Sequence, residues 1–237
     1  MFKHFSYFLY KILKILDFIF EKLLKKSFFF WFIEFSKNES YKIIDIERKK
    51  VKFFVPNQLV NYRVNTFFTK EPETLEWIKN FNDDEEIIFW DIGANIGLYS
   101  IYASLIHKNI KVYSFEPSTS NLRILSRNIS INNLENKILI NQFPLSKSEK
   151  GFNLMMENEF MEGGALHSFG LKKNFEGNIL NPKNNYMIYG FNIDYIINNL
   201  NFEIPNYLKI DVDGLEHQIL EGGINTLSHK NIKSILI

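Results

Sequence analysis

The sequence predicts an α/β fold in which a parallel β-sheet carries helices on both faces. From Ile87 onward, short apolar runs alternate with helical patterns: IIFWD, a helix over 98–106, KVYSF, a helix over 122–131, and KILIN. Because strand–helix–strand units form right-handed crossovers between parallel strands, this order favours a parallel sheet. The same alternation resumes near the end of the chain with YLKID, a helix near 215–220, and IKSILI.

The composition supports a globular chain and excludes several classes of protein. The 237 residues include 28 basic and 27 acidic side chains, no cysteine and 46% hydrophobic residues. Collagen-like, mucin-like, disordered and disulfide-scaffold proteins do not have this composition. Without cysteine there is no thiolate nucleophile or thiolate metal site. A net charge of +1 provides no basic footprint, so we expect no nucleic-acid partner.

Charged residues interrupt the apolar beginning of the chain, and the sequence contains no run of 18 apolar residues. A transmembrane helix is therefore disfavoured. A cleavable signal peptide is also disfavoured, because the apolar stretch over 5–10 is short and no small-residue cleavage site follows it. We expect a cytoplasmic protein, with peripheral contact at the membrane through residues 1–26 as an open alternative.

Residues 1–35 form the first predicted segment, a single amphipathic helix. Residues 1–26 contain six lysines and two acidic residues, a local charge of +4, whereas the rest of the chain carries −3. The apolar stripe of this helix can pack on protein, which is the more common arrangement, or lie in a membrane interface. The stripe consists of Phe5, Phe8, Leu9, Ile12, Leu16, Ile19, Phe20 and Leu23.

Residues 36–82 form the second predicted segment, and residues 83–237 form the main domain. The second segment contains a hairpin of strands over 41–46 and 51–55, followed by a helix that starts at Pro72. Within the main domain, residues 151–156 and 187–193 are predicted strands, and the stretch 157–187 between them is a loop candidate for shaping a substrate site. The chain stops in an apolar strand, so we expect either that it is a fragment or that this edge is covered.

The turn after the first strand of the main domain is the strongest ligand-binding signal. Gly93 and Gly97 lie between an apolar strand and a helix, where the backbone can approach a ligand and helix N–H groups point toward it. Their G-x-x-x-G spacing differs from the G-x-G-x-x-G of dinucleotide sites, and the sequence has no G-x-x-x-x-G-K-[ST] motif. Pyrophosphate and triphosphate ligands are therefore less favoured.

Acidic residues lie at the ends of the first two strands. Asp91 would repel a phosphate but suits an ammonium or sulfonium group, while the helix amides beyond Gly97 suit a carboxylate. Glu116 follows Gly97 by nineteen residues, a distance typical of acids that accept ribose hydroxyls. S-adenosylmethionine combines the ammonium, sulfonium and carboxylate groups, so this pattern favours it as cofactor. A purely structural turn is the alternative.

Four motifs resemble the FkbM-type family of class I S-adenosylmethionine-dependent methyltransferases. They are DIGANIGLYS, FEP, PLS at 144–146 and KIDVDGLEHQILEGG at 209–223, and the resemblance covers roughly residues 65–237. It implies a Rossmann-like sheet and O-methylation, with a saccharide or other small metabolite as acceptor. It also implies three parts of the cofactor site. These are a methionine-side loop of Asp91, Gly93, Asn95 and Gly97, a ribose contact at Glu116, and an adenine-side corner that includes Pro144 and Leu145.

The sequence departs from the family pattern in two places. Asp213 stands where the family usually has glutamate, which is a conservative change. A class I fold would also continue after the last residue with two more strands, so the C-terminal part of the sheet is expected to be incomplete.

Asp211 and Asp213 are the candidate catalytic residues. If YLKID lies beside the first strand, Asp211 reaches the same crevice as Asp91, where it can orient a hydroxyl group or remove its proton. The alternative is that Asp213 and Glu216 cap the following helix. An Asp-x-Asp pair could hold Mg²⁺ or Ca²⁺, but the full calcium-loop pattern is missing, so we predict no metal site. The histidines have no diagnostic spacing and are not candidates.

Two other functions remain open at this stage. The chain can be a binding or scaffold protein that keeps the sheet without turnover. A nucleic-acid methyltransferase is the third possibility, but it would need a basic face or an Asn/Asp-Pro-Pro-aromatic motif, and the sequence has neither.

Overall fold

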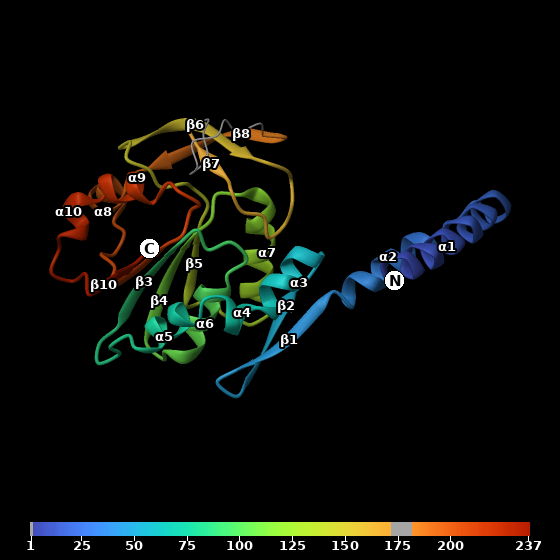
Figure 1. Cartoon of the computed structure of the whole chain (residues 1–237), viewed down its shortest axis with the longest axis horizontal. Coiled ribbons are helices and arrows are strands. Elements are labelled where there is room, and N and C mark those ends of the chain that lie inside the picture. The colour runs from blue at the N-terminus through green and yellow to red at the C-terminus, as the bar shows by residue number, and fades with distance from the viewer. Residues whose placement is uncertain (1, 172–181) are drawn as a thin grey trace. The chain divides into compact units, whose positions relative to one another are not determined.

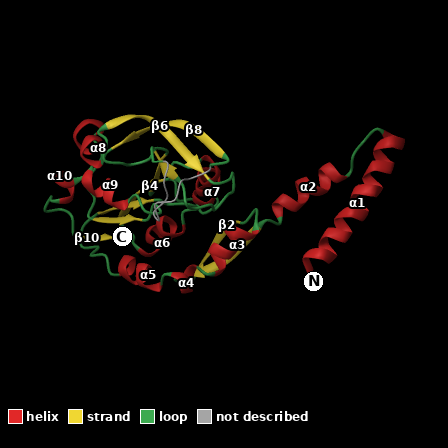
Figure 2. Cartoon of the chain, turned by 45° about the horizontal axis from the view of Figure 1, so that its top comes forward, coloured by secondary structure: helices red, strands yellow, loops and turns green. Residues whose placement is uncertain are grey.

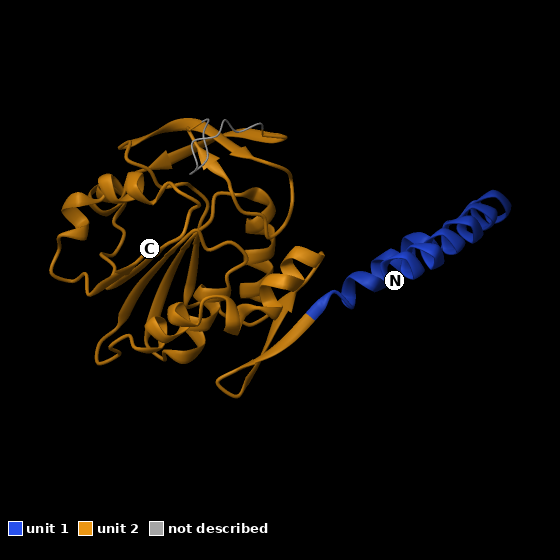
Figure 3. Ribbon diagram, viewed as in Figure 1, with its two compact units in different colours: residues 1–41 blue, residues 42–237 orange. Residues whose placement is uncertain are grey.

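The computed structural model describes residues 2–171 and 182–237. The chain divides into two compact units, Met1–Tyr41 and Lys42–Ile237 (Figure 3). The hairpin and the helices that follow it, which the sequence suggested as a segment of their own, are grouped with the main domain in the second unit.

The first unit is a pair of helices and not the single helix that was expected. Helix α1 spans Phe2–Leu24 and α2 spans Phe29–Asn38, and the two lie side by side (Figure 2). The break follows from the local backbone, because Lys25 adopts a left-handed conformation with φ of 56°. The chain then turns back, and the N–H of Phe29 donates to the Asp17 carboxylate at 2.9 Å. Within the described residues, no helix is both long and apolar enough to cross a bilayer.

The second unit begins with the predicted hairpin, which the structure confirms. Strands β1 (Tyr41–Ile46) and β2 (Lys49–Phe54) are joined by Glu47 and Arg48, both with positive φ, as a two-residue hairpin turn requires. Three short helices follow: α3 (Gln58–Asn65), α4 (Phe67–Lys70) and α5 (Pro72–Lys79). Pro72 occupies the first turn of α5, as predicted.

A five-stranded parallel sheet forms the centre of the second unit (Figure 1). Its order is β10-β9-β3-β4-β5, so β9 pairs with β3, as expected for the YLKID strand. The strand order reverses beside β3, which makes the carboxyl ends of β3, β4 and β9 the preferred place for a ligand. The strands are β3 (Ile87–Ile92), β4 (Ile110–Phe115), β5 (Ile138–Asn141), β9 (Tyr207–Ile210) and β10 (Ser234–Leu236).

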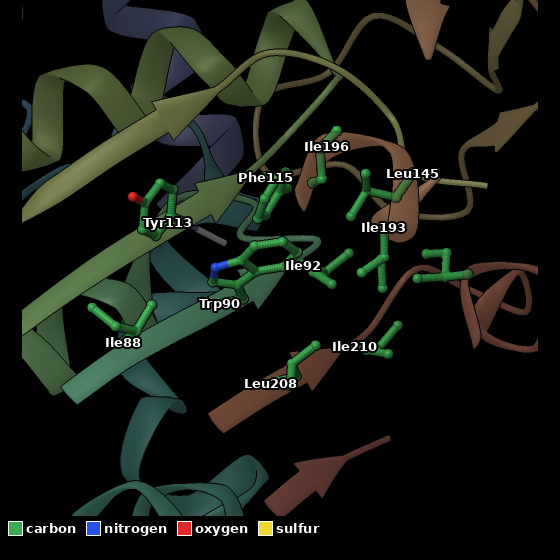
Figure 4. Close-up of a cluster of buried hydrophobic side chains, with 11 residues drawn as sticks. Ile88, Trp90, Ile92, Tyr113, Phe115, Leu145, Ile193, Ile196, Leu208 and Ile210 are labelled. Carbon is green, nitrogen blue, oxygen red and sulfur yellow. The ribbon is translucent and has the colours of Figure 1, made fainter. Parts of the chain in front are cut away.

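Helices cover both faces of this sheet, which confirms the predicted fold class. On one face, Trp90 packs in a buried cluster with Ile193 of α8 (Figure 4). The cluster also contains Ile219 of α9. On the other face, Asp91 contacts Ser100 of α6. Residues that alternate along β3 therefore point to opposite faces. The helices are α6 (Leu98–Ile106), α7 (Thr119–Ser130), α8 (Ile193–Leu200), α9 (Glu216–Glu221) and α10 (Ile224–Leu227).

A second, antiparallel sheet contains the strands expected near 151–156 and 187–193. Strand β6 (Lys150–Glu157) lies between β7 (Ser168–Phe169) and β8 (Asn184–Phe191). The expected loop over 157–187 is therefore interrupted by β7, and its residues 172–181 lie outside the described part of the chain. Strands β6 and β8 pair antiparallel with each other, and their sheet is distinct from the central parallel sheet.

Candidate functional site

The backbone of the turn between β3 and α6 lies close to the carboxyl ends of β4 and β9. Gly93 and Gly97 have φ of 82° and 87°, and Asn95 has φ of 50°. The N–H groups of Gly93 and Ala94 both donate to the Phe115 carbonyl at 3.0 Å. A Cβ on Gly93 would lie 1.9 Å from the Asp211 carbonyl oxygen. Only glycine allows this approach, which is the close backbone contact that the motif predicted.

A cavity opens beside this turn, at the carboxyl ends of the central strands. Its empty volume is about 600 Å³, within the range of small-molecule sites. Six of the nine predicted site residues line it: Gly93, Asn95, Glu116, Pro144, Leu145 and Asp211. Apolar side chains including Phe143, Met155 and Phe169 complete part of the wall. The cavity thus combines an apolar surface with a few polar groups, as ligand sites usually do.

Glu116 is the buried acid of this cavity. Its two carboxylate oxygens accept the N–H groups of Asn95 at 2.7 Å and Ser118 at 2.8 Å. Burial raises the pKa of Glu116 to about 7, although both backbone hydrogen bonds act in the opposite direction. Each oxygen has a second lone pair, so the carboxylate can also accept hydroxyl groups from a ligand in the cavity.

Asn95 offers a second acceptor. Its Nδ2 donates to the Gly164 carbonyl at 2.7 Å, while its buried Oδ1 has no hydrogen-bond partner within residues 2–171 and 182–237. A buried amide oxygen without a partner is costly unless a ligand or water satisfies it. The residues present therefore fit a polar ligand at this position.

Asp91 does not line the cavity, contrary to its expected place in the cofactor site. The side chain is fully buried on the α6 face of the sheet, and its Oδ2 accepts the hydroxyl of Ser100 at 2.5 Å. Ser100 also shares a hydrogen bond with Ser114 of β4 at 2.7 Å. Burial raises the pKa of Asp91, and the nearby Lys209 only partly offsets this. The structure thus gives Asp91 a supporting position behind the turn.

Gly97 likewise lies outside the lining of the cavity. It precedes the first residue of α6, and a Cβ there would lie 2.6 Å from Cδ1 of Leu125. Its observed role is to let the turn enter the helix with a left-handed residue.

Asp211 follows β9 and faces the cavity. Its carboxylate lies 3.0 Å from the ammonium of Lys209, which is itself buried and lies over the Tyr99 ring. Burial opposes the ionisation of Asp211, but Lys209 and more distant cations lower its pKa below the usual value. Asp211 is therefore a charged hydrogen-bond acceptor at neutral pH.

Asp213 is not among the residues that line the cavity. Its Oδ2 accepts the N–H of Leu166 at 2.6 Å, and burial raises its pKa. Glu216 accepts the N–H groups of Val212 and Gly214 at 3.1 Å, so it closes the loop that leads into α9. No side chain caps the first turn of α9, so the expected capping by Asp213 and Glu216 is not observed, and a catalytic role for Asp213 stays a prediction.

A second cavity, with an empty volume of about 480 Å³, adjoins the first. Gly93, Asn95 and Asp211 line both. The charged and aromatic residues that line the second cavity and not the first were not predicted as site residues; they are Arg63, Phe67, Lys70, Glu71, Tyr99 and Lys209. They come from segments before β3, from α6 and from β9, so no local motif connects them.

Tyr99 and Glu71 form a pair in this second cavity. The Tyr99 hydroxyl donates to Glu71 at 2.7 Å, and burial together with this carboxylate raises the pKa of Tyr99. Lys70 forms an ion pair with Glu71 at 2.5 Å. The second cavity therefore contains a cationic group, an anionic group and a hydroxyl that are bonded to one another.

His167 is a further lining residue of the first cavity that sequence reasoning did not select. Burial lowers its pKa, so the ring is neutral at physiological pH. The preceding loop is fixed by Asn121, which accepts the Gly163 N–H at 2.8 Å, and by Asn95. The position of His167 depends on these long-range contacts, and the sequence holds no local signal for it.

Comparisons with known proteins find a matching family and distantly similar solved structures. A family model described as the methyltransferase FkbM domain matches residues 91–237, more than half of the chain. No curated protein matches. Among solved structures, a precorrin-6Y C5,15-methyltransferase from Geobacter metallireducens has 14% identity and a TM-score of 0.37, over 64% of this chain and 53% of that one. A SAM-dependent methyltransferase from Agrobacterium tumefaciens has 15% identity and a TM-score of 0.34, over 44% and 32%. The chain thus spans about half the length of the first protein and a third of the second.

Proposed function

Because the chain belongs to the FkbM methyltransferase family, whose cofactor is S-adenosylmethionine, we propose that it methylates a hydroxyl group of a saccharide or another small metabolite. The observation that carries this proposal is the pair of adjoining cavities that share Gly93, Asn95 and Asp211. Methyl transfer needs a donor and an acceptor side by side, and two cavities with a common wall supply that arrangement.

The first cavity is the proposed donor side. Glu116 provides an acidic acceptor for ribose hydroxyls, and the apolar Phe143 and Leu145 provide a surface for a purine ring. The unsatisfied Oδ1 of Asn95 offers another acceptor near the shared wall. Asp91 supports this side indirectly, through Ser100 at the start of α6.

The second cavity is the proposed acceptor side. Its lining includes Arg63, Lys70 and Glu71, and charged groups of both signs can hydrogen-bond to a hydroxyl-rich molecule. An apolar acceptor would displace water from these charged groups without replacing its hydrogen bonds, which carries an energetic penalty in a cavity. The polarity of the lining therefore favours a saccharide over a hydrophobic acceptor.

When bound, S-adenosylmethionine would supply the methyl group of its sulfonium to an acceptor oxygen, with S-adenosylhomocysteine as the leaving group and the hydroxyl proton released. Asp211 lies on the shared wall, where an ionised carboxylate can accept the acceptor's O–H and orient its oxygen. Because Lys209 holds the pKa of Asp211 low, Asp211 is a weak base, and we propose orientation as its main contribution. Asp213, whose pKa is raised, is the alternative proton acceptor.

Calorimetry with S-adenosylmethionine, combined with transfer of a tritiated methyl group to glycan fractions, tests this function. Asp211→Asn keeps the shape of the side chain but removes its charge, so we expect cofactor binding to persist while transfer falls about a hundredfold. Asp84→Asn is the matched control, because Asp84 is exposed and lines neither cavity. Cofactor binding by the unmodified chain without transfer to any acceptor would instead support a non-catalytic binding protein.

A further inference from the structure

In the first unit, Met1–Tyr41, a charged side chain is buried between the helices and apolar side chains are exposed, the reverse of a helical hairpin in water. Asp17, a charged residue, is buried between its two helices with 4% of its surface exposed. Its carboxylate accepts the Ser27 hydroxyl and the Phe29 N–H, each at 2.9 Å. The helix contact therefore includes a satisfied polar group, whereas helical hairpins in water usually bury apolar side chains there.

The apolar side chains of this unit are instead exposed. Helix α2 contacts α1 through Tyr10, Lys14 and Asp17, which lie away from the apolar stripe predicted from the sequence. All members of the stripe are exposed, from 39% for Ile12 to 75% for Leu23. Helix α2 adds its own exposed apolar residues, Phe30, Trp31, Phe32, Ile33 and Phe35. Continuous apolar surface of this kind marks a contact with protein or membrane.

The charge of the unit indicates which contact it is. Seven lysines against four acidic residues give residues 1–41 a formal charge of +3, while the rest of the chain carries −2. In α1 the lysines lie on the side of the helix opposite the stripe, as in helices that lie in a membrane interface. The lysines are all exposed: Lys3, Lys11, Lys14, Lys22, Lys25, Lys26 and Lys37.

We propose that the first unit docks onto an anionic lipid surface, with the stripe of α1 in the boundary between headgroups and acyl chains. The lysines then face the negatively charged headgroups, and the exposed Trp31 has the amphipathic ring that is enriched at such boundaries. The surface complements a membrane better than it complements a second copy of the chain, because two copies would bring together units of equal positive charge. The proposed docking uses residues of the first unit only, so it does not depend on the proposed methyl transfer.

Co-sedimentation of the full chain with lipid vesicles tests the proposal. One set of vesicles contains phosphatidylcholine alone, and the other contains phosphatidylcholine with an equal amount of phosphatidylglycerol. We expect binding to the anionic set, weakening as salt is added because exposed charges are screened. Reversing the charge of Lys11, Lys22 and Lys26 to glutamate should weaken this binding by at least about a hundredfold. Reversing Lys50, Lys108 and Lys230, which are exposed in the second unit, is the matched control and should have a much smaller effect.

A second variant separates lipid docking from protein contacts. Leu16→Asn, Ile19→Asn and Leu23→Asn together remove part of the exposed stripe, so vesicle binding should be lost while thermal unfolding of the chain stays unchanged. Light scattering without vesicles measures the oligomeric state of the same proteins. A dimer that this variant dissociates, with no vesicle binding by the unmodified chain, would overturn the proposal in favour of a second copy. Absence of both vesicle binding and dimer would overturn it in favour of another protein partner.

Discussion

Replacing Gly93 with alanine tests the close approach of the β3–α6 turn to β9. The added Cβ would lie 1.9 Å from the Asp211 carbonyl oxygen, so the two backbones must separate by about 1.5 Å to reach ordinary contact at 3.4 Å. The neighbouring atom belongs to the backbone and cannot rotate away. Gly93 also has φ of 82°, a left-handed conformation that costs alanine about 1–2 kcal/mol.

The separation also strains the hydrogen bonds that hold the turn. The Gly93 N–H donates to the Phe115 carbonyl and the Asp211 N–H to the Ile92 carbonyl, both at 3.0 Å. Losing one such bond costs about 1 kcal/mol. With the backbone strain, we expect the free energy of unfolding to fall by about 3 kcal/mol in total, which lowers Tm by about 10 °C in a chain of this size.

The same displacement moves Asp211 and Val212, which line the first cavity, the proposed donor side. We expect the Kd for S-adenosylmethionine to rise at least about tenfold, and methyl transfer to fall about a hundredfold, because a shift of about 1 Å in a positioned group has that effect. Calorimetry gives the Kd, and thermal unfolding followed by circular dichroism gives Tm.

Alanine substitutions at two other glycines serve as comparisons for this experiment. Gly151→Ala is the control, since a Cβ there would have no neighbour within 4 Å. Gly97→Ala should have an intermediate effect, because its nearest neighbour is the movable Cδ1 of Leu125 at 2.6 Å. If Gly93→Ala bound S-adenosylmethionine with unchanged affinity and unfolded at the temperature of the unmodified chain, the assigned contact between the turn and Asp211 would be refuted.

Three further predictions concern buried side chains. The pKa of Glu116, raised to about 7 by burial, leaves the carboxyl mostly protonated at pH 6 and mostly ionised at pH 8. Since ribose hydroxyls bind the ionised form better, affinity for S-adenosylmethionine should rise up to about tenfold between these pH values, and calorimetry with Glu116→Gln should show a much weaker dependence. Asp91→Ala removes one of the two hydrogen-bond partners of the Ser100 hydroxyl and should lower the free energy of unfolding by about 1–3 kcal/mol in urea titrations, whereas Asp91→Asn should lower it less; equal losses would contradict the hydrogen-bond assignment. Trp90→Ala should cost about 3–5 kcal/mol by the same measurement, because the side chain is fully buried, and a loss below about 1 kcal/mol would argue against the packed cluster.

Much of the central fold could be predicted because its signals are local. Each strand of the parallel sheet is a short apolar run, and Pro72 marks the start of a helix through its fixed φ. The predicted single helix at the beginning of the chain was wrong for an equally local reason. Residues 25–28, KKSF, contain no proline or glycine that would mark a break, but the left-handed Lys25 ends the first helix, and the contact of Phe29 with Asp17 turns the chain back.

The candidate site was predictable only in part. Gly93 and Glu116 reach the cavity because each follows the carboxyl end of a parallel strand, and those ends lie at one edge of the sheet. Asp91 also ends a strand, but its side chain points to the α6 face because side chains alternate along β3. Which of the two faces forms the cavity depends on how the helices pack, so spacing alone could not show that Asp91 lies outside the cavity lining, and its role in cofactor binding stays a prediction.

The sequence by itself determined the alternation of strands and helices, the glycine turn and the family, since these depend on neighbouring residues. The tertiary structure alone decided that Arg63 and Lys70 line one cavity with Asp211, and that His167 lines the other. Residues so distant along the chain meet only when the helices before β3 and the loop before β7 pack onto the sheet edge. That packing depends on long-range hydrogen bonds and shape, such as the donation from Arg63 to the Gly163 carbonyl at 2.6 Å, which no local pattern encodes.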